Sequence, residues 1–310
     1  MAGARSDSGF GDLIAAAWAA ADQAAERAGV HIGEALESSD QSDVRAVLDH
    51  VWPGQSTQVT PNLLRALVHS GSYCSLARDR VSGRPVGAAL GLVGRDGDIE
   101  GGVYLHSHMA GVWSDERDRH IGTALKLHQR AWAMAEGIPV VSWTFDPLVR
   151  RNAFFNVVRL GVQVREYHED FYGAMTDAVN AGDRSDRLVA WWVLDSNQAA
   201  LAVAGELRAP SSGAVLDVAR FLLTEEGGEP VRHEDPQEHE SVLVALPADI
   251  VAIRQADAAA ALRWRYAVRE ALHASYAVGL RVSMVTTDGA YVLQPPAGGN
   301  EPKETSDEPN

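Results

Sequence analysis

The chain has 310 residues, 46% of them hydrophobic, which is enough for one large or two modest domains with a buried core. Its formal net charge of -15 at pH 7 would repel nucleic acid, so nucleic acid is excluded as the main partner. Cys74 is the only cysteine, which rules out an internal disulfide and favours a reducing compartment, the cytoplasm. No apolar run approaches the roughly 20 residues of a membrane span, so no membrane partner is expected.

The first half of the chain is predicted to contain helices and strands in a definite order. Residues 1–29 are predicted to be an extension, with a polar start and a helix from Asp12 to about Ala28 that Gly29 ends. Hydrophobic periodicity, caps and turn residues predict the elements that follow. These are strands at 30–36, 73–80, 84–93, 103–112, 140–145 and 164–171, and helices at 44–52, 60–70, 121–135 and 149–160.

The charged run DRSDR at 183–187 is predicted to separate two domains, at 30–182 and 188–296. In the second domain we expect strands at 188–194 and 242–246, helices at 198–206 and 258–276, and a hairpin at 281–293 around Asp288 and Gly289. An acidic loop is expected at 225–240, and a disordered polar tail at 297–310. This half is either a degenerate copy of the first domain or a companion that covers one side of a substrate cleft.

The first half is organised around the run from Tyr104 to Gln129. A strand ending at Val112 leads through the charged turn SDERDRHIG into a helix. The first backbone N–H groups of such a helix have no intrahelical partner, and together with the helix dipole they form an anion site. Arg117 and Arg119 would add positive charge to it.

This strand, loop and helix resemble the segment with which GNAT acyltransferases bind the pyrophosphate of coenzyme A, written R/Q-x-x-G-x-G/A. Two frames are open. The frame 119–124 matches the letters, whereas the frame 117–122 better matches the family's distance from the strand end, and we prefer it. The preferred frame puts His120 where the family usually has its first glycine, a departure that bears on how closely the backbone approaches the pyrophosphate.

The order of elements over about 30–180 is also similar to that of the GNAT family. The stretches WTFDPLVRRNAFFNVVRLG and EYHEDFYGAM resemble one branch of it, whose members have about this length. The resemblance implies an α/β (α+β) fold with a mixed, mostly antiparallel twisted sheet flanked by helices, followed by a second α+β region. It also implies an acyl-CoA-dependent N-acyltransferase, with acetyl-CoA as the default donor, no metal, and a small-molecule amine or amino acid as acceptor.

Three other functions stay open. Some relatives of this branch are associated with amino-acid succinylation, so an amino-acid N-succinyltransferase is one alternative. A CoA-binding or regulatory module without turnover is a second alternative, and an enzyme that hydrolyses or decarboxylates the thioester is a third. A homodimer is one option for the assembled state.

The resemblance also implies site residues. The end of the central strand and the following loop would bind the donor, together with two asparagines that share a helix face: Met109, Ala110, Val112, Arg117, Arg119, His120, Ile121, Gly122, Thr123, Asn152 and Asn156. The arginines Arg150, Arg151, Arg159 and Arg165 are further candidates for a phosphate or an acidic substrate.

Acyl transfer to an amine needs a base, and two histidines and one aspartate are candidates. His106 falls where several family members keep a catalytic glutamate, and His108, two residues on, is expected on the same strand face. Asp146, after the next strand, is the competing base. No cysteine or carboxylate cluster accompanies the histidine pair, which argues against a metal site.

The proton for the departing thiolate has no obvious source. Val157 stands where the family keeps its tyrosine, so Tyr167, Tyr172 or water would have to replace it.

Overall fold

The computed structural model describes residues 7–53, 59–173 and 184–296, without the side chains of residues 7, 8 and 117. The predicted polar start, most of the residues just before the predicted domain boundary, and the predicted tail at 297–310 lie outside these ranges. The chain divides into two compact units, one of 1–147 with 151–208 and the other of 148–150 with 209–310. No described helix is both long and apolar enough to cross a bilayer.

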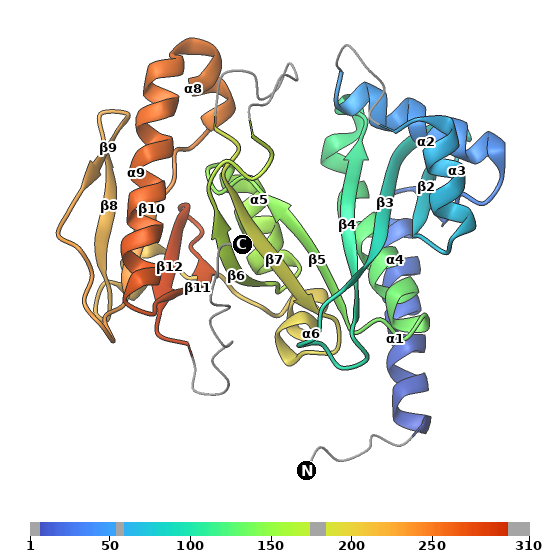
Figure 1. Cartoon of the computed structure of the whole chain (residues 1–310), viewed down its shortest axis with the longest axis horizontal. Helices are drawn as coiled ribbons and strands as arrows, with labels where there is room; N and C mark the ends of the chain where they lie inside the picture. The colour runs from blue at the N-terminus through green and yellow to red at the C-terminus, as the bar shows by residue number, and fades with distance from the viewer. Residues whose placement is uncertain (1–6, 54–58, 174–183, 297–310) are drawn as a thin grey trace, which may run out of the picture. The chain divides into compact units, whose positions relative to one another are not determined.

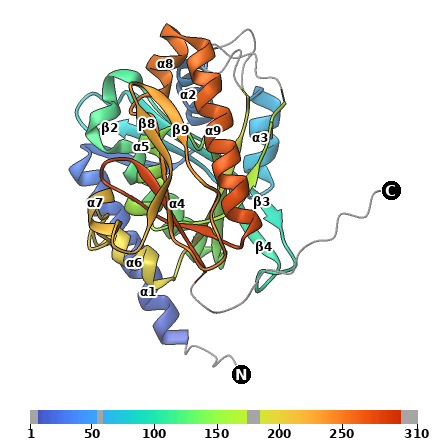
Figure 2. The ribbon, with the colours of Figure 1, turned by 90° about the vertical axis from the view of Figure 1, so that its left-hand side faces the viewer.

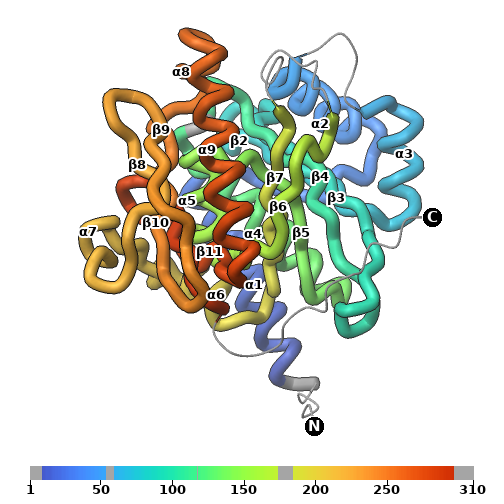
Figure 3. Tube along the Cα trace, turned by 60° about the vertical axis from the view of Figure 1, so that its left-hand side comes forward, coloured from blue at the N-terminus to red at the C-terminus, as the bar shows by residue number. Residues whose placement is uncertain are grey.

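The first unit is built on a seven-stranded sheet with the order β1-β2-β3-β4-β5-β7-β6. All its strand pairs are antiparallel except β4 with β5. In Figure 3, β4, β5 and β7 run next to one another. The strands are β1 (Val30–Glu34), β2 (Cys74–Asp79), β3 (Pro85–Arg95), β4 (Val103–Val112), β5 (Val140–Phe145), β6 (Gln163–His168) and β7 (Arg187–Val193).

Helices flank both faces of this sheet. They are α1 (Asp7–Arg27), α2 (Ser38–Val51), α3 (Pro61–His69), α4 (Ile121–Ala135), α5 (Arg150–Phe154) and α6 (Asn197–Val203), with a 3-10 helix at Ser114–Arg119 and a π-helix at Phe155–Arg159. Local signals explain several of them. Thr60 accepts a hydrogen bond from the Leu63 N–H and Pro61 takes the first turn, so α3 begins where the sequence predicts. The predicted fold class, a mixed and mostly antiparallel sheet flanked by helices, is confirmed.

Two glycines show that α4 and α2 cover opposite faces of the sheet. A Cβ at Gly87 would lie 3.1 Å from both Ile121 and Leu125 of α4, and a Cβ at Gly111 would lie 3.0 Å from Val51 of α2. Gly87 pairs with the residue after Gly111, so the two glycines point to opposite faces. On the α4 side, α1 packs along α4, as Figure 1 shows.

The second unit contains a five-stranded sheet with the order β11-β12-β10-β8-β9. Its strands are β8 (Arg220–Glu226), β9 (Glu229–Arg232), β10 (Val242–Ala245), β11 (Arg281–Val285) and β12 (Ala290–Gln294). Its helices are α7 (Ser212–Val215), α8 (Ile250–Ala256) and α9 (Ala258–Ala277). In Figure 2, α9 runs along the strands, and it packs against β8, β9 and β10. The predicted hairpin around Gly289, which has φ 88°, is confirmed.

The structure differs from two of the predictions for the second half of the chain. The strand β7 pairs with both β5 and β6, so it completes the first sheet, and the second unit begins at 209 rather than at 188. The stretch at 225–240 was expected to be a loop, but its first part forms the hairpin β8-β9. Gly227 and Gly228 have φ 62° and 87°, the left-handed backbone that a tight hairpin turn requires.

Candidate functional site

The parallel strands β4 and β5 part shortly after they meet. They pair only at Leu105 with Val141 and at His106 with Ser142. Beyond these positions β4 continues to Val112, and it stays paired with β3 along its other edge. Figure 1 shows the two strands diverging. The β5-facing edge of β4 from 107 onwards therefore presents backbone N–H and C=O groups that are available to an extended partner.

A β-bulge reorients β4 at the point of parting. Leu90 pairs with Met109 and Gly91 pairs with Ser107, so His108 is an extra residue on β4. As a result Ser107 and Met109, two residues apart, face opposite ways. Ser107 accepts a hydrogen bond from Lys126 of α4, whereas Met109 packs against the core cluster of α2 and α3.

The predicted histidines lie together beside this bulge. The ring centroids of His106 and His108 are 5.9 Å apart. Burial lowers the pKa of His106, and the neighbouring His108 and Lys126 lower it further. Burial also lowers the pKa of His108. Both imidazoles are therefore neutral at pH 7 and able to accept a proton.

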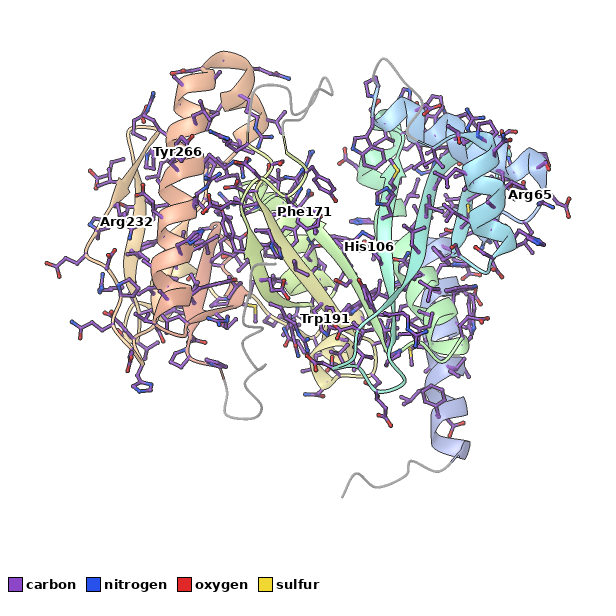
Figure 4. All side chains as sticks on the ribbon, in the orientation of Figure 1. Arg65, His106, Phe171, Trp191, Arg232 and Tyr266 are labelled. Carbon is purple, nitrogen blue, oxygen red and sulfur yellow. The ribbon has the colours of Figure 1, made fainter. Side chains whose placement is uncertain are left out.

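A row of side chains extends from His106 across the face opposite α4. Ser142 pairs with His106 on one side and with Trp191 on the other, and paired residues point to the same face. Thr144 lies two residues beyond Ser142, and its hydroxyl is 3.0 Å from the hydroxyl of Tyr172. Figure 4 labels His106 on β4 and Trp191 on β7. The structure thus brings two of the predicted catalytic residues, His106 and Tyr172, to one face of the sheet.

The loop after β4 places helix α4 with its N-terminus open. His120 precedes the helix with φ 61° and ψ 18°, the left-handed conformation that glycine adopts without strain, and its side chain makes no capping bond. The backbone N–H groups of Thr123 and Ala124 donate the first hydrogen bonds of the helix, both to the His120 carbonyl. The N–H groups of Ile121 and Gly122 come before them in the chain, at the open start of the helix. A Cβ at Gly122 would meet nothing within 4 Å, so an anion has room there.

The two predicted arginines of the loop have different outcomes. Arg119 forms salt bridges with Glu116 at 2.6 Å and with Asp79 at 2.9 Å, and it donates to the carbonyls of Ala28 and Gly29. It therefore fastens the loop to the start of β1 and the end of β2, and its charge is neutralised there rather than presented to a phosphate. The side chain of Arg117 lies outside the described residues.

The segment after β5 differs from the helix that was predicted. It is the short helix α5 followed by a π-helix, after which Leu160 donates to the Phe155 carbonyl five residues back. The expected shared face is lost, because Asn152 is exposed while Asn156 is only 4% exposed. Val157 is buried and supplies no proton.

The other predicted groups around β5 and β6 are placed as follows. Tyr167 donates a short hydrogen bond to the Asp186 carboxylate, which leaves Tyr172 as the exposed phenol of the two. Asp146 follows the end of β5 and is partly buried. Within the described ranges, no group of three or more histidine, cysteine, aspartate or glutamate side chains is arranged to hold a metal.

Lys126 is a buried group beside the parting strands that the sequence reasoning missed. It lies on α4, only 7% exposed, and its Nζ is 2.8 Å from Ser107 Oγ and 3.7 Å from the ring centroid of Trp143. Burial lowers its pKa to about 7. The available signal was composition, since Lys126 and Lys303 are the only lysines beside an abundance of arginine. A lone lysine inside an apolar helix is unusual, because lysine is almost never fully buried without a partner.

The chain is similar to known proteins in structure but not in sequence. No protein-family model matches the sequence, and no curated protein matches it. Among solved structures, a GNAT-family acetyltransferase from Streptococcus pneumoniae is similar at 16% identity and TM-score 0.40, over 52% of this chain and 98% of that one. One from Elizabethkingia anophelis with acetyl-CoA bound is similar at 11% identity and TM-score 0.41, over 53% and 98%.

The ribosomal-protein-S5-alanine acetyltransferase of Vibrio fischeri is similar at 12% identity and TM-score 0.41, over 54% of this chain and 94% of that one. The structural neighbours of this chain are thus GNAT-family acetyltransferases over about half of its length.

Proposed function

We propose that the chain is an acyl-CoA-dependent N-acyltransferase acting on a small-molecule amine or amino acid by direct attack. The observation that carries the proposal is the parting of β4 from β5 beside a neutral imidazole, His106, with the open N-terminus of α4 at the end of the same strand. A strand edge, an anion site and a base are the three parts that such a transfer needs.

The chain's own groups fit a long donor that has amides at one end and a pyrophosphate at the other. The edge of β4 at Met109, Ala110 and Val112 offers backbone groups to an extended amide chain. The amides of Ile121 and Gly122, with the open space above Gly122, suit a pyrophosphate. Coenzyme A has both features, and when bound it supplies an acyl group activated as a thioester.

His106 has the position and the protonation state of a general base. Because its pKa is lowered, the ring is neutral at pH 7 and accepts the proton that the attacking amine loses. Tyr172 Oη lies on the same face and shares a hydrogen bond with the Thr144 hydroxyl. It is the candidate acid that donates a proton to the departing sulfur. His108 and Asp146 remain the alternative bases, since both lie at the same end of the paired strands.

Arg165 supports an acceptor that carries a carboxylate. Its guanidinium stacks on Trp191 at 4.2 Å, and it forms no salt bridge among the residues that the structure describes. Trp191 and His106 are two strands apart in one row, roughly 10 Å at the usual strand spacing. An acceptor with its amine at His106 and a carboxylate at Arg165 would span this row.

The test is calorimetric titration with CoA and acetyl-CoA, followed by a panel of amines and amino acids in which release of free thiol is measured. Micromolar binding and amine-dependent thiol release are expected. Binding without release over the whole panel would favour a non-catalytic CoA-binding module, which the strained His120 and the buried Val157 make the second candidate. Release without amine would indicate hydrolysis, and no binding at all would refute the proposal.

A further inference from the structure

A buried pair of hydrogen-bond donors lies beneath the parting strands. Lys126 and Gln129 stand three residues apart on α4, and their side chains are 7% and 0% exposed. The Nζ of Lys126 donates to Gln129 Oε1 at 3.2 Å and to Ser107 Oγ at 2.8 Å. The other end of the Gln129 amide, Nε2, is buried without a hydrogen-bond partner.

These donors have no anion to match them. All the contacts of the Lys126 ammonium are neutral: a hydroxyl, an amide oxygen and the face of Trp143. Among the described residues no carboxylate forms a salt bridge with it, and burial is the one cause that lowers its pKa, to about 7. A buried ammonium beside an unsatisfied amide N–H is an arrangement that a carboxylate would complete.

The position of the pair relates it to the proposed donor site. Ser107 and Trp143 are the first residues of β4 and β5 beyond the last paired positions. Lys126 Nζ contacts both, so it sits at the apex of the divergence, on the α4 side of the sheet. His106 faces the opposite side, from which an amine would approach. An acyl group whose carbonyl is exposed to that amine would extend its far end towards α4.

We infer that Lys126 and Gln129 bind the terminal carboxylate of a dicarboxylic acyl group, such as a succinyl group, carried by the donor. The inference rests on the proposed function, because it assigns the acyl end of the same site. Lys126 would provide the charge and Gln129 Nε2 the second hydrogen bond. Acyl groups without a terminal carboxylate would leave both donors unmatched, so the pair would select among donors.

Binding measured without turnover tests the inference. Wild-type protein is titrated calorimetrically with succinyl-CoA, acetyl-CoA and CoA, and we expect succinyl-CoA to bind roughly ten to a hundred times more tightly than acetyl-CoA, as a charged hydrogen bond allows. Lys126→Met should remove this preference while binding of acetyl-CoA and CoA stays within about twofold. Methionine fills the same space without charge, so folding is expected to survive.

Arg130→Met is the matched control. Arg130 is a buried cation on the same helix, but it donates to the Leu194 carbonyl at 3.0 and 2.6 Å, and none of the hydrogen bonds of the described residues joins it to Ser107. This variant should keep the preference for succinyl-CoA. Circular dichroism of both variants establishes that each is folded before titration.

Proton uptake is the second readout. Most Lys126 side chains are neutral at pH 7.5 because the pKa is about 7. A carboxylate raises that pKa, so binding of succinyl-CoA should take up roughly 0.7 proton per site, seen as a dependence of the binding enthalpy on the ionisation enthalpy of the buffer. Acetyl-CoA, and succinyl-CoA with Lys126→Met, should show no such uptake.

The outcomes separate the two proposals. Equal affinity for the two acyl donors, a preference that survives Lys126→Met, or no proton uptake would overturn the inference and leave the acyltransferase proposal standing. Failure of all three ligands to bind would overturn both proposals.

Discussion

Replacing Lys126 by methionine should change the stability of the protein in a way that depends on pH. Lys126 is 7% exposed, and burial lowers its pKa from 10.5 to about 7. In the unfolded chain the side chain regains a pKa of about 10.4, so between pH 7 and pH 10 the unfolded state binds more protons than the folded state. Wild-type stability therefore rises with pH across this window, and below pH 7 the ammonium is buried at full cost.

The magnitude follows from the two pKa values. At about 1.4 kcal/mol per pH unit, their difference corresponds to about 5 kcal/mol. Methionine carries no charge, so Lys126→Met should be more stable than wild type by up to that amount at pH 6. The advantage should shrink by about 4 kcal/mol on going to pH 10, where the folded lysine is neutral and the unfolded one is close to its own pKa.

Urea unfolding of both proteins between pH 6 and pH 10, followed by tryptophan fluorescence, measures this difference. Arg130→Met is again the control, because a guanidinium stays protonated throughout this range and its replacement should produce no comparable pH dependence. A difference between Lys126→Met and wild type that stays constant within about 1 kcal/mol across the range would refute the reasoning. The lysine would then be hydrated or paired in solution.

Three further predictions concern the proposed donor and base sites. His106→Ala should lower kcat by about two to four orders of magnitude, and an unchanged rate at saturating donor would remove His106 from this role. The wild-type rate should fall towards acid pH as the base becomes protonated, at a pH below the ordinary pKa of imidazole because burial lowers the pKa of His106. His120→Gly should raise the free energy of unfolding by about 1 kcal/mol and tighten CoA binding, because glycine adopts φ 61° without strain, whereas His120→Ala, which keeps the Cβ, should give neither gain in thermal melts and titrations. Gly122→Val should leave the fold intact, since a Cβ there meets nothing within 4 Å, but weaken CoA binding by about tenfold or more; unaltered affinity would place the pyrophosphate elsewhere.

Much of the fold was readable from local sequence. Short apolar runs bounded by turn residues indicate β2, β3 and β4, a spacing of three to four residues indicates α2 and α4, and Thr60-Pro61 marks the start of α3. The uncapped start of α4 was also predictable, because it depends only on a strand, a tight loop and a helix in succession. His106 and His108 were expected on one face of their strand, and their ring centroids lie 5.9 Å apart. All these features arise from residues close together along the chain.

Other features depended on contacts between distant residues. Whether β7 belonged to the first or the second unit was decided by its pairing with β5 and β6, and no pattern within the strand reveals that choice. The predicted role of Arg119 changed because Asp79, forty residues away, neutralises it. The shared face of Asn152 and Asn156 was lost to a π-helix, which alters the angle between successive residues.

The arrangement at the centre of the candidate site belongs to this second group. The sequence by itself determined that a strand would end near a helix with an open N-terminus and that histidines would stand on that strand. Only the tertiary structure decided that β4 parts from β5 after His106, that a bulge turns Ser107 towards α4, and that Lys126 lies buried between them. The physical reason is that strand pairing and burial are properties of the packed chain, since each joins residues whose separation in sequence says nothing about their separation in space.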